Sequence, residues 1–248
     1  MDPITQYHQV ITEVLAKIAT EQREPMEKAA RIIADSIAEG RIFHIFGTGG
    51  HSNMAAIEFC HRAGNLVPCN AILDAGIGVE HGATRWIERV VGYAKQVLDY
   101  YRVKPGDVMV LVNAYGMNPV TIDAALECRE RGVTVIAVTS PELSLAVPPS
   151  LPSRHPSKKN LFELADVVIN SYTPFGEAVV DIEGFAAKVS PISTITNLFI
   201  LDSINAKVSE ILAKRGITPP VWISGNIPGG DEANRNYLEQ YFGKIRHL

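Results

Sequence analysis

Hydrophobic positions recur with two different periods along the 248-residue chain. In residues 1–40 apolar side chains return every three or four positions, which is the spacing of an amphipathic helix. Pro25 marks the start of a second helix and Gly40 its end. This region predicts two helices arranged as a hairpin, each with an apolar stripe that must be buried against the following domain or a partner chain.

From residue 41 onward, short apolar runs alternate with helical or polar segments. Five of the runs are rich in β-branched residues and bounded by turns, as buried strands are. They are IFHIF at 42–46, LVPCNAI at 66–72, VMVLVN at 108–113, VTVIAV at 133–138 and VVIN at 167–170. Strands that alternate with helices indicate an α/β fold, with five parallel strands in a doubly wound sheet.

The remaining segments define the domain organisation. Helical patterns cover about 85–101 and 193–215, and the five prolines between 140 and 160 predict a surface loop or lid. Residues 216–248 mix polar and aromatic side chains, which is typical of an arm packed on the body or on a neighbouring subunit. We therefore divide the chain into an N-terminal helical hairpin at 1–40, an α/β domain at 41–215 and a C-terminal arm at 216–248.

Composition excludes several classes of function. The formal net charge is −4 and no stripe of Lys and Arg is present, so nucleic acid is not an expected partner. The first ten residues lack the apolar core of a secretory signal, and no apolar run approaches the length of a membrane span. Three scattered cysteines fit neither a disulfide framework nor a zinc knuckle. We expect a cytoplasmic protein that binds neither membranes nor nucleic acid.

The segment GTGGHSN at 47–53, here called the glycine loop, follows the first strand. Ligands of open parallel sheets bind outside the carboxyl ends of the strands. The loop offers backbone N–H groups and hydroxyls from Gly47, Thr48, Gly49, Gly50 and Ser52. It lacks the third glycine of a dinucleotide fingerprint, so no cofactor is expected. The loop favours an anion or polyol ligand, with a plain tight turn as the alternative.

A second loop, NAYGMN at 113–118, leads into an alanine-containing helix and the strand VTVIAVTS. With the glycine loop, this layout resembles a sugar isomerase (SIS) domain. The likeness covers most of the chain and is greatest to bacterial stand-alone SIS proteins related to phosphoheptose isomerase and N-acetylmuramic acid 6-phosphate etherase. The matching segments are FGTGGHS at 46–52, FCHRAG at 59–64, ERVVGYA at 88–94, KPGD at 104–107, NP at 118–119, SPIST at 190–194 and PPVWISGN at 219–226.

The resemblance implies a flavodoxin-like sheet and a sugar or sugar phosphate as the ligand. The second loop departs from the family, because Asn113, Tyr115 and Asn118 stand where phosphosugar-binding loops carry hydroxyl residues. A phosphate dianion favours several charge-assisted donors, whereas amides and a phenol suit sugar hydroxyls, carboxylates or sulfonates. The predicted substrate is a small acidic sugar that is phosphorylated or, given this loop, sulfonated, carboxylated or neutral.

Aldose–ketose isomerisation needs a base that moves a proton between C1 and C2, and a group that shuttles protons on the oxygens. Glu58 is the predicted base, because related isomerases carry a substrate-facing glutamate on the helix after the glycine loop. Pairing of Glu58 with Arg62 at i+4 is the alternative. His51 and His81 lie in loops beside glycines and are the predicted proton shuttles.

Three further residues are predicted to contact the substrate. Glu88 matches the ER pair of the similar group, and Ser193 and Thr194 open the last long helix, where helix capping is the alternative. We interpret Glu177 as a surface or hydrogen-bonded carboxylate. No metal is predicted, because the last long helix lacks the His of the phosphoheptose isomerase zinc set. The alternative is a metal site whose ligands come from His51, Glu58, His61 and His81.

The favoured function is an aldose–ketose isomerase that works through an enediol. A sugar sensor without chemistry is the first alternative. An etherase-like lyase is the second, weakened by Val91 where etherases carry a catalytic glutamate. Apolar stripes and an aromatic arm exceed what one sheet face can cover, so we expect a homodimer or higher homo-oligomer with shared sites.

Overall fold

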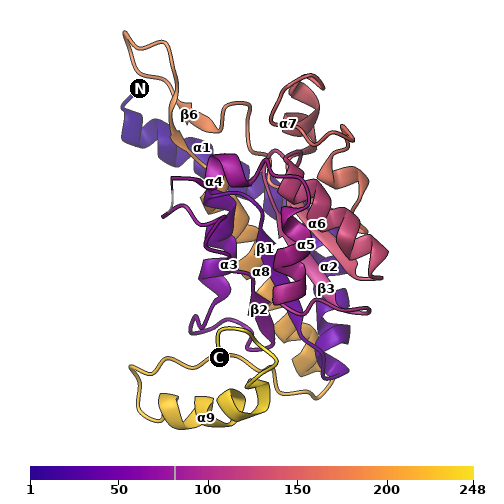
Figure 1. Ribbon diagram of the computed structural model, residues 1–248. Helices are drawn as coiled ribbons and strands as arrows, with labels where there is room; N and C mark the ends of the chain where they lie inside the picture. The colour runs from indigo at the N-terminus through magenta and orange to yellow at the C-terminus, as the bar shows by residue number, and fades with distance from the viewer. Residues whose placement is uncertain (81) are drawn as a thin grey trace.

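The computed structural model describes residues 1–80 and 82–248, so His81 lies outside the described residues. Five parallel strands form the main sheet in the order β2-β1-β3-β4-β5 (Figure 1). The strands are β1 (Phe43–Gly47), β2 (Cys69–Ala71), β3 (Val108–Val112), β4 (Thr134–Thr139) and β5 (Val167–Asn170). Each overlaps one of the five apolar runs, and the predicted parallel, flavodoxin-like sheet is confirmed.

The sheet is buried on both faces because its strands carry apolar side chains at consecutive positions. In β3, Val108, Val110 and Val112 point into one core, and Met109 and Leu111 point into the other. The first core is covered by α2 (Arg23–Ala38), α3 (Met54–Phe59) and α8 (Ser193–Lys214), the second by α5 (Tyr93–Tyr100) and α6 (Pro119–Glu130). The other elements are α1 (Pro3–Glu21), η1 (His51–Asn53), α4 (Thr84–Ile87), α7 (Pro141–Ala146), η2 (Leu161–Glu163), β6 (Ala178–Val180), β7 (Val189–Pro191) and α9 (Gly230–Tyr241).

The two N-terminal helices are present, but they are joined end to end and do not form a hairpin. The amide of Gln22 bonds the Ile18 carbonyl, and the amide of Met26 bonds the Gln22 carbonyl, so the helical path bends without reversing (Figure 1). Pro25 falls in the first turn of α2, where its missing N–H costs nothing. The stripe of α1 packs on the antiparallel β6–β7 ribbon, and the Tyr7 hydroxyl bonds the Pro191 carbonyl at 2.9 Å.

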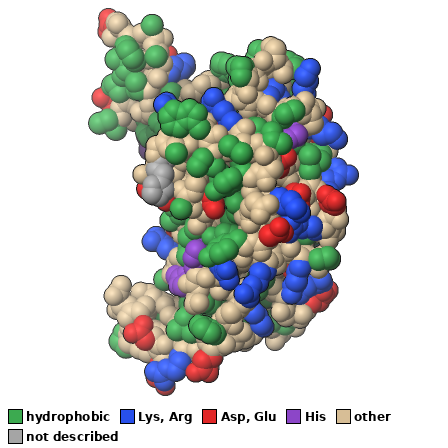
Figure 2. Space-filling model, in the orientation of Figure 1, with side chains coloured by type: hydrophobic (Ala, Val, Ile, Leu, Met, Phe, Trp, Pro, Cys, Tyr) green, Lys and Arg blue, Asp and Glu red, His purple; other side chains and the backbone are tan. Residues whose placement is uncertain are grey.

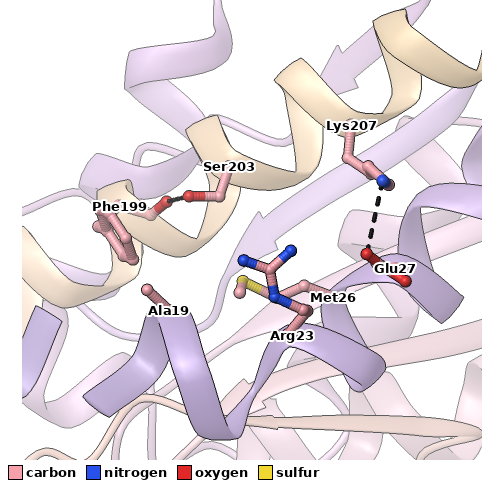
Figure 3. Close-up of a pocket in the computed structure, with 7 residues that line it drawn as sticks. All are labelled: Ala19, Arg23, Met26, Glu27, Phe199, Ser203 and Lys207. Atoms are coloured by element: carbon pink, nitrogen blue, oxygen red, sulfur yellow. Dashed lines mark hydrogen bonds and ion pairs between the residues drawn. The ribbon is translucent and has the colours of Figure 1, made fainter. Parts of the chain in front are cut away.

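A hollow of about 200 Å³ lies where α1 gives way to α2, opposite α8 (Figure 3). It is lined by Ala19, Arg23, Met26, Glu27, Phe199, Ser203 and Lys207. Lys207 Nζ lies 3.4 Å from Glu27 Oε1, and the Ser203 hydroxyl bonds the Phe199 carbonyl at 2.6 Å. The hollow belongs to the helical layer and contains none of the predicted site residues that the structure describes.

The predicted continuous helix at 85–101 is wrong. It is divided into α4 and α5, because Gly92 adopts a left-handed φ of 85° that interrupts the helical path. The intervening segment is tied to α6, since the amide of Val120 bonds the Glu88 carbonyl at 3.1 Å and the amide of Gly92 bonds Asp123 Oδ2 at 2.6 Å. Glu88 therefore lies at the end of α4, beside the start of α6.

The proline-rich segment at 140–160 contains the short helix α7 and a loop held by the side chain of Arg154. The buried guanidinium donates to the carbonyls of Ser144 and Val147 and to Asn160 Oδ1. In the C-terminal arm, Trp222, Tyr241 and Ile245 pack against Val67. Among the described residues, no helix is both long enough and apolar enough to span a bilayer.

Candidate functional site

A polar pocket of about 200 Å³ lies at the carboxyl ends of β1 and β3. These strands are neighbours, but the helices that follow them, α3 and α6, cover opposite faces of the sheet. Such a switch point is where ligands of doubly wound sheets bind. The lining residues are Gly49, Gly50, His51, Ser52, Glu88, Asn113, Ala114, Tyr115, Asn118, Glu177 and Ser193. All of them except Ala114 and Glu177 are predicted site residues.

The glycine loop owes its shape to two close approaches. A Cβ at Gly47 would overlap the backbone carbonyl of Ser52, so the turn accepts no side chain at this position. A Cβ at Gly49 would lie 3.0 Å from Asn113 Nδ2 and 3.2 Å from Glu88 Oε2. Gly49 thus lets the amide and the carboxylate come close to the loop backbone, where N–H groups are available to a ligand.

Thr48 and Thr194 lie outside the lining of the polar pocket. Thr48 is fully buried, and its hydroxyl oxygen lies 2.7 Å from that of Thr121, which ties β1 to α6. The Thr194 hydroxyl contacts the sulfur of Met54 at 3.9 Å. With Gly47, these two residues shape the walls and do not face the pocket.

The second loop is folded around Asn113. Its Oδ1 accepts the amide of Gly116 at 2.8 Å, and Gly116 adopts a left-handed φ of 56° that completes the turn. Asn118 caps α6 without a side-chain capping bond, and it lines the polar pocket together with Glu88. Burial, with the nearby charge of Glu177, raises the pKa of the Tyr115 phenol. The loop presents amide donors and a neutral phenol to the pocket.

Glu88 is a pocket carboxylate whose pKa is raised. Burial raises its pKa above the ordinary value of 4.5, and the negative charge of Glu177 acts in the same direction. The Arg89 charge and the Asn118 hydrogen bond oppose this shift without cancelling it. A half-buried carboxylate with a raised pKa is suited to accept and return a proton near neutral pH.

Glu177, which the sequence predicted to be a surface or hydrogen-bonded carboxylate, is hydrogen-bonded and also lines the polar pocket. It adopts a left-handed φ of 65°, which is uncommon for a residue with a side chain. The Ser193 hydroxyl donates to its Oε2 at 2.9 Å. Its position beyond the carboxyl end of the fifth predicted strand, at the same edge as the two loops, is the signal that could have found it.

Glu58 does not line the pocket formed by the described residues. Its Oε1 lies 3.1 Å from Arg62 Nε, which is the i+4 pairing considered as the alternative. α3 is a short helix that ends at Phe59. Glu58 therefore lies at the end of α3 that is farther from the glycine loop. The geometry does not place this carboxylate for the predicted role of base.

The histidines of the proposed metal set are separated. His51 lines the polar pocket, whereas His61 stacks on Trp222 of the C-terminal arm with ring centroids 5.5 Å apart. His81 lies outside the described residues. In residues 1–80 and 82–248, no three His, Cys, Asp or Glu side chains are grouped as metal ligands. The described donors do not fit the zinc set of a phosphoheptose isomerase.

A second cavity of about 370 Å³ adjoins the polar pocket and shares Glu88, Tyr115 and Asn118 with it. Its other lining residues are Arg89, Met117, Val147, Pro148, Leu151, Ser153 and Phe175. Arg89 is the one Arg or Lys that lines either cavity in the described part of the chain. A ligand held in the polar pocket can therefore extend past Glu88 towards a cationic, largely apolar chamber.

Comparison with known proteins shows the family of this chain. Residues 6–140 match the family model of the SIS domain. A UPF0309 protein of Caldanaerobacter subterraneus subsp. tengcongensis is 36% identical over 247 residues, which cover 98% of each chain. A UPF0309 protein of Brucella anthropi is 39% identical over 228 residues, covering 91% of this chain and 90% of that protein.

Solved structures share the fold at low sequence identity. A phosphoheptose isomerase from Francisella tularensis superposes with a TM-score of 0.55 and 16% identity, covering 84% of this chain and 97% of that one. The phosphoheptose isomerase of Neisseria gonorrhoeae gives a TM-score of 0.54, also at 16% identity. The fold, the family model and the full-length relatives agree, and the chain belongs to the SIS-domain family and, within it, to the UPF0309 proteins.

Proposed function

We propose that the protein is an aldose–ketose isomerase that acts on a small acidic sugar through an enediol. The observation that carries the proposal is the pairing of Glu88 and Glu177 in one pocket with His51 and hydroxyl- and amide-bearing loops. Burial and the nearby charge of Glu177 raise the pKa of Glu88, and a carboxylate with a raised pKa beside a second carboxylate is typical of acid–base sites. Membership of the SIS family supports a function related to sugars or sugar phosphates.

In this proposal Glu88 is the base, in place of Glu58. Its carboxylate removes the proton from C2 of the open-chain aldose, and the C–H electrons form the C1=C2 double bond of the enediol while O1 gains a proton. Glu88, whose proton exchanges with solvent in a fraction of turnovers, then delivers a proton to C1, and O2 loses its proton as the ketone forms. His51 carries the proton between the oxygens, so that the two isomers differ only in the positions of hydrogen atoms.

The remaining pocket groups would hold the substrate. The amides of Asn113 and Asn118 and the hydroxyl of Ser52 suit the sugar hydroxyls. Arg89 in the adjoining cavity would take the acidic group, because charge-assisted bonds to a guanidinium are strong and directional. A thermal-shift panel of phosphorylated, sulfonated, carboxylated and neutral sugars tests this, since a ligand of the native state raises Tm. Neutral sugars that shift Tm as much as acidic ones would contradict the role of Arg89.

The acid limb of the kcat/KM profile is expected to report Glu88. A base works only when ionised, so activity is lost as pH falls through a pKa that burial has raised above 4.5. The charge of Glu177 contributes to that rise, so Glu177→Gln should move the acid limb to lower pH. Asp181→Asn is the matched control, because Asp181 pairs with Lys188 on the exposed ribbon and should leave the limb in place. If the acid limb of Glu177→Gln stays where it is in the wild type, the charge of Glu177 does not influence the pKa of the base, and this prediction is wrong.

We also propose a homodimer in which the apolar surface beside the pocket is covered. Trp86, Val91 and Phe175 are 57%, 56% and 70% exposed, and exposed apolar groups gather around the hollow of the face in Figure 2. Exposed patches of this kind mark association surfaces. Light scattering is expected to give twice the mass of the chain, and Trp86→Ser to shift the protein towards monomer. Phe242→Ser, which replaces an apolar residue of the C-terminal arm that is 75% exposed, should remain dimeric. A monomeric wild-type protein would overturn this expectation.

A further inference from the structure

A basic cavity lies at the edge of the sheet opposite the polar pocket. It has a volume of about 330 Å³ and is lined by Gly40, Arg41, Ile42, Tyr101, Arg102, Lys104, Asp107, Gly243 and Lys244. These residues come from the segments before β1 and before β3 and from the C-terminal arm. Figure 1 shows that arm and α9 at the far end of the molecule from α4, whose C-cap is the pocket residue Glu88.

Positive charge in this cavity is largely unpaired. Arg41 forms an ion pair with Glu39, but in the described part of the chain Arg102, Lys104 and Lys244 pair with no carboxylate. The single lining carboxylate, Asp107, is buried and directed elsewhere. Its Oδ2 lies 3.0 Å from His44 Nε2 and accepts the backbone amide of Lys104 at 3.0 Å. Arg102, Lys104 and Lys244 therefore line one hollow without a carboxylate partner, in a chain whose net charge is −4, and Lys244 Nζ lies 5.6 Å from the centroid of the Tyr241 ring.

Backbone geometry shapes the cavity around Arg41 and Arg102. Arg102 follows α5 with a left-handed φ of 58°, and its Nη1 donates to the Gly243 carbonyl at 3.3 Å, so this side chain joins the body to the C-terminal arm. Gly106 has a φ of 83°, and a Cβ there would lie 2.6 Å from Arg41 Nη1. Figure 2 shows Lys and Arg side chains gathered where the body meets the lower lobe formed by the arm.

We propose that the basic cavity binds a diphosphate group, free or esterified, as a second ligand. Several converging guanidinium and ammonium donors favour an anion with more than one charge and many acceptor oxygens. The volume of about 330 Å³ exceeds the need of a single phosphate and leaves room for a second phosphate and part of an ester group. Because the two sites lie at opposite ends of β1 and β3, both can be occupied at once.

Isothermal titration with inorganic pyrophosphate tests the proposal. The wild-type protein is expected to bind it, with affinity that falls as salt is raised to about 0.5 M. The double variant Lys104→Gln/Lys244→Gln should bind at least about tenfold more weakly, because two charge-assisted contacts are lost. The matched control Lys158→Gln/Lys159→Gln removes two exposed lysines from the proline-rich segment and should bind as wild type does.

Glu88→Gln tests whether pyrophosphate binds at the basic cavity and not in the polar pocket. This variant should bind pyrophosphate as the wild-type protein does. Absence of binding up to about 5 mM pyrophosphate would overturn the proposal and leave the cations as partners of the helix ends of α2 and α5. Equal affinity of the Lys104/Lys244 double variant and wild type would also overturn it, as would a loss in Glu88→Gln. A nucleoside diphosphate that binds more tightly than pyrophosphate would support an esterified ligand, and the reverse order a free one.

Discussion

Replacing Glu88 with Gln is expected to lower kcat by about 10²- to 10⁴-fold, the contribution of a positioned general base. The amide has the shape of the carboxylate but cannot take up the proton from C2. Substrate affinity should change little, because Asn113, Ser52 and Arg89 are untouched. The fold should also be retained. Burial raises the pKa of Glu88, so the ionised side chain costs stability at neutral pH and a neutral isostere does not.

Glu58→Gln is the matched control for that experiment. Glu58 pairs with Arg62 outside the polar pocket, and an i,i+4 pair on a helix surface contributes about 0.3–0.5 kcal/mol. This variant should therefore turn over at close to the wild-type rate. If Glu58→Gln were inactive and Glu88→Gln active, the base would be the residue first predicted from the sequence, and the pocket assignment would be wrong.

Gly47→Ala is expected to have the largest effect on stability among the loop variants. The added Cβ would overlap the Ser52 carbonyl, and because this neighbour is backbone, the loop itself must move. Such overpacking costs about 3 kcal/mol, which lowers Tm by about 6–12 °C for a chain of this size. Displacement of the loop should also abolish the Tm increase that sugar ligands give to the wild type.

Gly49→Ala makes a useful contrast in the same loop. Its Cβ would meet the ends of the Asn113 and Glu88 side chains, which can shift, so its Tm should fall by less than half as much. Its turnover should nevertheless fall, because those two side chains belong to the pocket. Calorimetry and activity measured on both variants check the pair. A Gly47→Ala protein that melts and binds like wild type would contradict the structural role of this glycine.

The sheet could be predicted because each strand is apolar on both faces. Residues such as Val108 to Val112 leave no alternative to a doubly covered strand, and the five apolar runs mark five strands. The pocket could be predicted in outline for the same reason. Once the sheet is parallel, the glycine loop after β1 and the loop after β3 must meet at one edge.

Features set by tertiary contacts could not be predicted. Apolar periodicity continues through 85–101, and only the bonds from Val120 and Gly92 to neighbouring groups reveal that the chain leaves the helix near Glu88. Likewise, one residue separates α1 from α2, and the sequence around Gln22 does not distinguish a bend from a reversal. The i+4 pair of Glu58 with Arg62 and the hydrogen bond of Glu177 with Ser193 likewise depend on the folded structure.

Hydrogen exchange at the reacting carbon tests the central claim most directly. The protein would be incubated in D2O with each open-chain aldose or ketose of the sugar panel, and deuterium at the carbon beside the carbonyl followed by NMR. An acidic sugar that raises Tm is expected to gain deuterium at that carbon with the wild-type protein and with Glu58→Gln, but not with Glu88→Gln. Sugars that bind tightly and never exchange would contradict an isomerase and make the protein a sugar-binding sensor.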